Sequence, residues 1–131
     1  MSELSSNMYN PYSLEGKTIL ITGAASGIGK ATSIESSKLG AKIVAVDLNG
    51  EGLEKLMPQL EGEGHLQFTG NLCDEEFLKK LGEESPALDG VFLCAGVSDT
   101  TPVKFITEEK LKRVFDVNLT APIMMLKQLL K

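Results

Sequence analysis

The sequence predicts a doubly wound α/β fold, in which a parallel sheet of about four strands carries helices on both faces. Two observations support this prediction. Short apolar runs alternate four times with helical segments, and the connections between them are short. Parallel strands need crossovers that are usually helical, and right-handed crossovers place those helices on the faces of the sheet.

The composition fits one domain and excludes two classes of protein. The chain has 131 residues, 42% of them hydrophobic, and compact domains usually have about 100–200 residues. The formal net charge is -5 and the 13 basic residues are scattered, whereas a nucleic-acid interface needs clustered Lys and Arg. The sequence contains neither a secretory signal nor a run of about 18 apolar residues. We therefore expect a cytoplasmic protein that binds neither nucleic acid nor membrane.

The cysteines and the histidine do not predict a metal site. Cys73 and Cys94 lack the spacing of a CxxC motif, so we expect free, buried thiols in a reducing compartment. His65 is the single histidine and has no metal-ligand partner in the sequence around it. We expect His65 to be structural and the protein to hold no metal.

The first predicted elements follow a polar segment, residues 1–13, which we expect to be a flexible leader. Residues 17–22, KTILIT, predict a buried strand that ends at a glycine, and residues 28–39 predict the next helix. Gly40 stands where a helix C-terminal glycine is favoured. Residues 41–47, AKIVAVD, predict the second strand.

The middle of the chain repeats the pattern of helix and strand. Asn49 suits the N-cap of a short helix that Pro58 is expected to end or bend. Residues 65–70 predict the third strand, and residues 74–82 predict a helix with acids in its first turn and lysines in its last. Residues 88–96, LDGVFLCAG, predict the fourth strand.

The last predicted element is a helix of roughly 23 residues that begins near Thr107, whose hydroxyl can cap it. Residues 118–130 are apolar on more than one face, as expected for a helix that is buried on two sides. The strand at 88–96 would form an unpaired apolar edge, which isolated proteins usually cover. Both features predict that residues 14–131 are the first part of a larger domain.

Gly23, Gly27 and Gly29 lie where the first strand turns into a helix. A pyrophosphate approaches the backbone there more closely than a Cβ atom allows, and the positive end of the helix faces its charge. A tight turn can also recruit glycine without a ligand. The order of strand, glycine loop and helix favours a dinucleotide site over a simple turn.

Asp47 ends the second strand, close to the spacing of about 20 residues from the glycine loop at which an acid contacts the adenosine ribose. A carboxylate there can accept hydrogen bonds from the ribose hydroxyls and would repel a 2′-phosphate. Asp47 therefore favours NAD over NADP as the cofactor. The alternative role is to cap the helix that follows, for which Asn49 is better placed.

Four segments together resemble the short-chain dehydrogenase/reductase family. They are TGAASGIG at 22–29, with the family's T-G-x-x-x-G-x-G spacing, VDL at 46–48, LCAGV at 93–97, which aligns with its N-N-A-G segment, and FDVNLTAP at 115–122. The resemblance runs from about Leu14 to the end of the chain. It implies a Rossmann-type fold, a nicotinamide cofactor, and hydride transfer between that cofactor and a small carbonyl or alcohol substrate.

The resemblance also implies the site residues. Asn118 matches the catalytic Asn of the family. The family's Tyr and Lys, spaced Y-x-x-x-K, have no match, because Tyr9 is followed four positions later by Ser13 and Tyr12 by Gly16. We therefore expect this chain alone to lack dehydrogenase activity. The implied cofactor-binding residues are Gly23, Ser26, Gly27, Ile28, Gly29, Asp47, Leu48, Asn71, Leu72, Ala95 and Gly96.

Two segments depart from the family pattern. Asn71 and Leu72 stand where the family usually has Asp followed by Val or Leu at the adenine, and the Asn71 carbonyl oxygen can still accept from the adenine amino group. Leu93 and Cys94 replace the two asparagines of N-N-A-G. Hydrogen bonds that stiffen the central sheet are therefore either lost or replaced.

Asn118 has two interpretations. Pro122 lacks an N–H, so the Asn118 carbonyl loses its helical partner and can hold a water, as in the family's proton relay. The alternative is a plain proline kink with Asn118 packed against a neighbouring loop.

Two functions other than an oxidoreductase are compatible with parts of the sequence. A non-catalytic nucleotide-binding or interaction module would use the exposed strand edge and the last helix to recruit a partner. A Rossmann-type methyltransferase also has a glycine loop and an acid after the second strand, but the T-G-x-x-x-G-I-G spacing and Asn118 disfavour it. The family further implies a homo-oligomer, a dimer or tetramer, that forms through the last helix.

Overall fold

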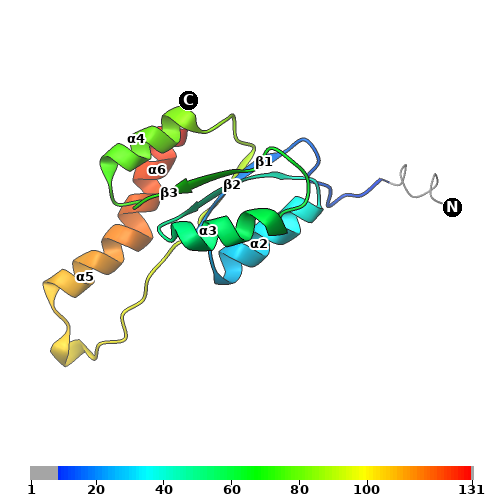
Figure 1. Ribbon diagram of the computed structural model, residues 1–131. Helices are drawn as coiled ribbons and strands as arrows, with labels where there is room; N and C mark the ends of the chain where they lie inside the picture. The colour runs from blue at the N-terminus through cyan, green and yellow to red at the C-terminus, as the bar shows by residue number, and fades with distance from the viewer. Residues whose placement is uncertain (1–8, 131) are drawn as a thin grey trace.

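The computed structural model describes residues 9–130, in which four parallel strands form one sheet in the order β3-β2-β1-β4 (Figure 1). The chain moves outward from β1 to β2 and β3, then returns to pair β4 with the other side of β1. This reversal beside β1 is the switch point of a doubly wound sheet. The strands are β1 (Thr18–Thr22), β2 (Lys42–Asp47), β3 (Leu66–Thr69) and β4 (Gly90–Phe92).

Five α-helices connect or follow these strands. They are α2 (Gly27–Lys38), α3 (Gly50–Leu56), α4 (Glu75–Glu84), α5 (Glu108–Phe115) and α6 (Ala121–Leu129). Three of them begin at side-chain caps, because Asn49, Asp74 and Thr107 accept hydrogen bonds from first-turn N–H groups. The caps at Asn49 and Thr107 were predicted. Each such cap contributes about 1 kcal/mol. Short 3-10 turns at Met57–Gln59 and Val103–Phe105 complete the description, with a π turn at Asp116–Thr120.

The helices cover both faces of the sheet, as predicted. Ile21 and its neighbours pack against α2 and α3, whereas Leu20 packs against α4 and α6. Adjacent residues of a strand point to opposite faces, and both of these side chains are 0% exposed. A sheet that is covered on both faces needs apolar residues at consecutive positions, which explains the unbroken apolar run in β1.

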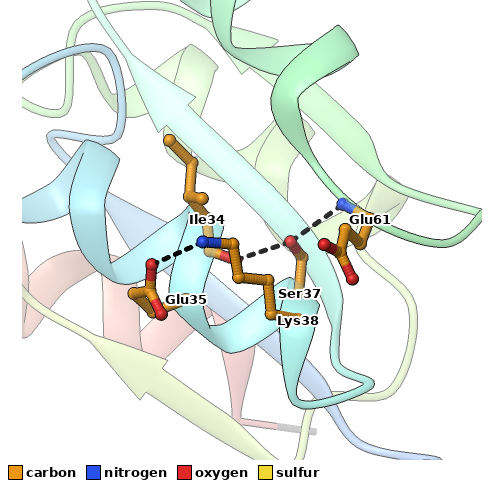
Figure 2. Close-up of polar contacts among 5 residues, drawn as sticks. All are labelled: Ile34, Glu35, Ser37, Lys38 and Glu61. Carbon is orange, nitrogen blue, oxygen red and sulfur yellow. Dashed lines mark hydrogen bonds and ion pairs between the residues drawn. The ribbon is translucent and has the colours of Figure 1, made fainter.

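A polar network holds the segment between α3 and β3 against α2 and β2. The Ser37 hydroxyl donates to the Ile34 carbonyl at 2.7 Å and accepts from the Glu61 N–H at 3.0 Å (Figure 2). His65 Nε2 lies 2.7 Å from the Glu61 carbonyl oxygen, and its Nδ1 accepts from the Ile43 N–H at 3.0 Å. Both ring nitrogens thus contact backbone groups, which confirms a structural role for His65.

The N-terminal part of the predicted leader, residues 1–8, lies outside the described residues. From Leu14 onward the chain is hydrogen-bonded to the rest of the domain, because the Leu14 N–H donates to the Leu39 carbonyl at 2.8 Å. Gly40, which follows α2, has a φ of 99°, as a helix C-terminal glycine requires.

Two predicted boundaries were wrong. The helix predicted at 74–82 continues to Glu84, so its lysines lie in the middle of the helix and not in the last turn. The fourth strand is shorter than predicted, because only Gly90–Phe92 pairs with β1. Beyond Phe92, the Cys94 N–H turns to a side chain, the Thr22 hydroxyl, which takes the place of a ladder partner.

The last predicted helix is interrupted. Between α5 and α6 the Ala121 N–H bonds to the Asp116 carbonyl, five residues earlier, which is the hydrogen bond of a π turn. Pro122 follows at once and has no N–H to offer to an α-helical acceptor. The predicted single helix is therefore two helices joined by a π turn, and α5 extends away from the sheet (Figure 1). Among residues 9–130, no helix has the length and apolar character needed to cross a membrane.

Candidate cofactor site

A cleft of about 980 Å³ lies at the carboxyl ends of the strands, bounded on its outer side by α5. Doubly wound sheets bind their ligands at this edge, beside the switch point. All of the predicted cofactor-binding residues except Gly29 line it, and Asn118 does not line it. The predicted residues on its walls are Gly23, Ser26, Gly27, Ile28, Asp47, Leu48, Asn71, Leu72, Ala95 and Gly96.

The three glycines of the loop have different structural roles. Gly23 has a φ of 65°, and a Cβ there would lie 3.0 Å from the Ala95 nitrogen. Gly27 has a φ of 54° but open space where its Cβ would be. A Cβ on Gly29 would lie 2.1 Å from the Gly23 carbonyl oxygen. Gly29 therefore allows the helix to pack on the loop, while Gly23 and Gly27 shape the wall of the cleft.

The N-terminus of α2 opens into the cleft. Ser26 is its N-cap, and among the described residues its side chain makes no capping hydrogen bond. The first N–H groups of a helix lack intrahelical acceptors and carry partial positive charge. With Ser26, Gly27 and Ile28 on the cleft wall, these groups suit a diphosphate.

The Asp47 carboxylate is held against the glycine loop. One oxygen accepts from the Ala25 N–H at 3.0 Å, and the other accepts from the Asn49 N–H at 2.9 Å. The cap of α3 comes from Asn49, which accepts from the Gly52 N–H. Asp47 therefore does not serve as the N-cap of that helix. A carboxylate oxygen has more than one acceptor position, so both oxygens can still accept from a ribose.

Asn71 differs from the sequence-based expectation in how its acceptor is used. Its side-chain oxygen accepts from the Cys73 N–H at 2.9 Å and closes a local turn before α4. One acceptor position remains on that oxygen for an adenine amino group. Leu72, the next residue, is half-buried and lies on the same wall.

Thr22 is a residue that the sequence-based site did not include. Its hydroxyl oxygen accepts from the N–H groups of Cys94 and Ala95, both at 3.0 Å, and the side chain is 2% exposed. These bonds fix the segment after β4 to the glycine loop. The sequence left open whether the hydrogen bonds of the two family asparagines are lost or replaced where this chain has Leu93 and Cys94. They are replaced, because Thr22 makes the contacts between this segment and the sheet. Thr22 is the first residue of the T-G-x-x-x-G-x-G motif, and this position was the sequence signal from which its role could have been predicted.

Asn118 holds the segment that follows Gly96. Its Nδ2 donates to the Val97 carbonyl at 2.6 Å, and its Oδ1 accepts from the Val97 N–H at 2.8 Å. A Cβ on Gly96 would come within 3.2 Å of that Oδ1. Asn118 thus packs against a neighbouring loop, the second of its two interpretations, and a part in proton transfer stays a prediction.

The outer wall of the cleft is a charged face formed by α5 and the π turn. The sequence did not predict that this face lines the cleft. Its residues recur at intervals of three and four and are Glu109, Lys112, Arg113 and Asp116. Asp116 forms an ion pair with Lys112, and this hydrogen bond and charge raise the pKa of Lys112. The spacing of these residues places them on one helix face, but only the tertiary structure shows that this face is directed into the cleft.

The two cysteines also line the cleft, contrary to their predicted burial. Cys73 is exposed and Cys94 is half-buried, and both are free. Burial was inferred from apolar neighbours in the sequence, but both residues lie just past the ends of edge strands. Within residues 9–130, no group of His, Cys, Asp and Glu is arranged to hold a metal ion.

Comparison with known proteins identifies the family. A family model described as short chain dehydrogenase matches residues 17–131. The chain belongs to the short-chain dehydrogenase/reductase family. The members of this family bind nicotinamide cofactors, and the glycine loop, the α2 N-terminus and Asp47 fit such a group.

Individual relatives have different substrates. The chain is 33% identical over 120 residues to a D-threitol dehydrogenase of Mycolicibacterium smegmatis, covering 87% of this chain and 46% of the relative. It is 36% identical over 112 residues to a 3-oxoacyl-(acyl-carrier-protein) reductase of Thermotoga maritima, covering 81% and 46%. The chain thus spans about half the length of the curated relatives it matches.

Solved structures confirm the Rossmann-type fold. A short-chain dehydrogenase of Shigella flexneri, complexed with NADP, has a TM-score of 0.84 at 27% identity and covers 92% of this chain and 55% of its own. A short-chain dehydrogenase of Escherichia coli, complexed with NADPH, also has a TM-score of 0.84 at 27% identity, with coverage of 93% and 55%. These neighbours do not support the expected preference for NAD.

Proposed function

We propose that this chain is the cofactor-binding part of an oxidoreductase that transfers a hydride between a nicotinamide cofactor and a carbonyl or alcohol of a small molecule. The observation that carries this proposal is the position of Asp47. Its carboxylate is bonded to the Ala25 N–H of the glycine loop, so the ribose acceptor and the phosphate cradle form one site. When bound, the cofactor supplies or accepts the hydride.

Each wall of the cleft has a proposed part in binding. The N–H groups at the start of α2 and the Ser26 hydroxyl hold the diphosphate. Asp47 and Leu48 contact the adenosine ribose, and Asn71 and Leu72 contact the adenine. Ala95 and Gly96 lie beside the nicotinamide ribose. Asn118 keeps that last segment in place through Val97.

We propose a preference for NAD on the strength of the Asp47 charge. A 2′-phosphate at the ribose would meet a carboxylate whose two oxygens are already oriented by backbone N–H groups. Negative charges that are brought close together repel each other, and within residues 9–130 the cleft lining includes no Lys or Arg on β2 beside Asp47. Lys112 and Arg113, the cations that line it, lie on α5.

The 131-residue chain is proposed to bind the cofactor without turnover. The sequence contains no Y-x-x-x-K pair, and in the family this pair protonates or deprotonates the substrate oxygen. Asn118 alone cannot supply that proton. The substrate class therefore stays at the level of small carbonyls and alcohols.

Two further parts of the proposal concern the assembly and its location. Leu111, Phe115, Leu119 and Ile123 recur every four residues, and between 46% and 56% of each side chain is exposed. An exposed apolar stripe of this kind marks an interaction surface, and we assign it to a second copy of the chain. The two unbridged cysteines are compatible with a cytoplasmic location.

Calorimetric titration with NADH and NADPH tests the cofactor assignment. We expect the chain to bind NADH more tightly than NADPH. Asp47→Asn keeps the shape of the side chain but removes its charge, so we expect roughly tenfold weaker NADH binding and a smaller difference between the two nucleotides. Glu63→Gln changes the same charge on an exposed residue outside the cleft and serves as the matched control.

The possible results separate the parts of the proposal. If the folded chain binds neither nucleotide, the cofactor site is wrong. If it binds both equally, with or without the Asp47 charge, only the NAD preference is wrong. An effect of Glu63→Gln as large as that of Asp47→Asn would show a general response to net charge and not a ribose contact.

A further inference from the structure

Arg113 is the only arginine of a chain that has twelve lysines. It lies on α5 and lines the cofactor cleft. An arginine guanidinium presents a planar fork of N–H groups that matches the oxygens of a phosphate, whereas a lysine ammonium acts as a point charge. The side chain best suited to hold a phosphate through two bonds is therefore on the wall of the cleft.

Arg113 is also the cation of the cleft that no carboxylate contacts. Among residues 9–130, the cleft is lined by two basic side chains, Lys112 and Arg113. Lys112 forms an ion pair with Asp116, whereas Arg113 forms no ion pair or hydrogen bond with another described side chain. Glu109 stands four positions earlier, at a spacing that allows a pair, but the two are not bonded. The Arg113 guanidinium is therefore available to a ligand.

The wall formed by the glycine loop and the start of α2 lacks a full positive charge. Its residues in the cleft are Gly23, Ser26, Gly27 and Ile28, and none of them is basic. A helix N-terminus supplies the equivalent of about half an elementary charge, whereas a dinucleotide carries a negative charge on each phosphate. The helix end by itself leaves most of that negative charge unmatched.

Lys112 lies toward the β3 side of the cleft. The hydrogen bond and the charge of Asp116 raise the pKa of Lys112, and the charge of Cys73, which follows β3, acts in the same direction. The proposed adenine contacts, Asn71 and Leu72, precede Cys73 directly. Lys112 therefore belongs to the adenine end of the cleft.

Arg113 lies toward the β4 side of the cleft. Asp99 is part of the segment that follows β4, and its pKa is lowered first by hydrogen bonds to Thr101 and then by the charges of Lys110 and Arg113. β4 pairs with β1, the strand that leads into the glycine loop. Arg113 is thus on the side of the cleft where the diphosphate is proposed to bind.

We propose that the Arg113 guanidinium binds the cofactor diphosphate from the α5 wall, so that the phosphates are held between the N-terminus of α2 and a full positive charge. This inference rests on the proposed cofactor site. A guanidinium can bind a phosphate through two parallel N–H bonds, which are charge-assisted and therefore strong. Arg113 is a binding residue in this proposal and takes no part in the hydride transfer.

Calorimetric titration with NADH tests the proposal on matched variants. Arg113→Gln removes the charge of an exposed side chain, so the chain should keep its fold and bind NADH roughly tenfold more weakly. Arg113→Lys keeps the charge but not the fork, and its loss should be smaller. Lys127→Gln removes the same charge from an exposed residue of α6 outside the cleft and should leave the affinity unchanged.

ADP-ribose separates the diphosphate from the rest of the cofactor. It has the diphosphate of NADH but no nicotinamide ring, so Arg113→Gln should weaken both ligands by the same factor. A loss confined to NADH would place Arg113 at the nicotinamide. A much larger loss for NADPH than for NADH would place it at the 2′-phosphate. Either result would overturn the proposal.

The single arginine also allows a chemical measurement that needs no variant. Phenylglyoxal modifies arginine guanidinium groups, and mass spectrometry of the peptides reports the modification of Arg113. At an NADH concentration of about ten times its Kd, mass action predicts roughly tenfold slower modification. ADP-ribose should protect Arg113 in the same way.

The outcomes distinguish this inference from the function it rests on. If the unchanged chain binds neither NADH nor ADP-ribose, the proposed cofactor site fails and this inference fails with it. If the unchanged chain binds both and Arg113→Gln binds them equally tightly, only the inference is overturned. Modification of Arg113 that NADH does not slow, or an equal loss of affinity in Lys127→Gln, would also overturn it.

Discussion

The side-chain amide of Asn118 bonds to both polar backbone groups of Val97. Its Nδ2 donates to the Val97 carbonyl at 2.6 Å while its Oδ1 accepts from the Val97 N–H at 2.8 Å. An amide can satisfy one residue's donor and acceptor together, because it carries both functions on one planar group. The side chain of Asn118 therefore joins the π turn at Asp116–Thr120 to the segment that follows Gly96 at the cleft.

Replacing Asn118 should loosen the segment that follows Gly96. Asn118→Ala removes both bonds, and each is expected to contribute about 1 kcal/mol to stability. Asn118→Asp keeps an acceptor for the Val97 N–H but places a charge against the Val97 carbonyl. Hydrogen exchange of the Val97 amide should therefore be faster in Asn118→Ala than in Asn118→Asp. Equal exchange in both variants and in the unchanged chain would contradict this role.

Thr22 should matter through its hydroxyl. Thr22→Val keeps the shape of the side chain but leaves the N–H groups of Cys94 and Ala95 without their acceptor, which is expected to cost about 1–3 kcal/mol in the free energy of unfolding. Thr22→Ser keeps the acceptor and loses one buried methyl, at about 1 kcal/mol. Urea denaturation compares them. A Ser variant that is less stable than the Val variant would show that packing, and not hydrogen bonding, governs this position.

Gly29 and Gly27 should respond differently to the same substitution. Gly29→Ala places a Cβ 2.1 Å from the Gly23 carbonyl oxygen, and we expect a loss of stability of about 3 kcal/mol. Gly27→Ala meets open space but keeps a positive φ, which costs about 1–2 kcal/mol. Thermal unfolding measures both. The packing role of Gly29 would be wrong if its variant were as stable as the unchanged chain.

The apolar stripe on α5 and the following turns should control self-association. Phe115 and Leu119 lie within the stripe and are 53% and 52% exposed. Phe115→Asp should weaken association by roughly tenfold or more, because a hot-spot residue near the centre of an interface contributes about 2 kcal/mol or more. Val103→Asp changes an apolar residue that is 88% exposed and lies outside the stripe. Sedimentation velocity that shows a monomer for the unchanged chain would refute the assignment.

Features set by neighbouring residues were predicted well from the sequence. The caps at Asn49 and Thr107 form as expected, since each involves a bond to an N–H three residues away. The parallel sheet with helices on both faces was implied by alternation and short connections, because crossovers between parallel strands have one favoured hand. The predicted cofactor-binding residues follow all four strands. They meet at one edge of the sheet for the same reason.

Two features set by distant residues were not predicted. Cys73 was expected to be buried and is exposed, because its exposure depends on which helices cover the edge of β3. The fourth strand ends early because the hydroxyl of Thr22, 72 positions before Cys94, captures its backbone N–H. No pattern of neighbouring residues in the sequence predicts the exposure of Cys73 or the early end of the fourth strand.

The sequence by itself therefore determined the alternating α/β order, the caps, the glycine loop and the acid that follows the second strand. Only the tertiary structure decided that Asn118 would hold Val97, that a charged face of α5 would close the cleft, and that two thiols would flank it. The physical reason is one of range. Propensity, capping and crossover handedness act over a few residues or one connection, whereas the pairing of a side chain with a distant backbone depends on the whole packed chain.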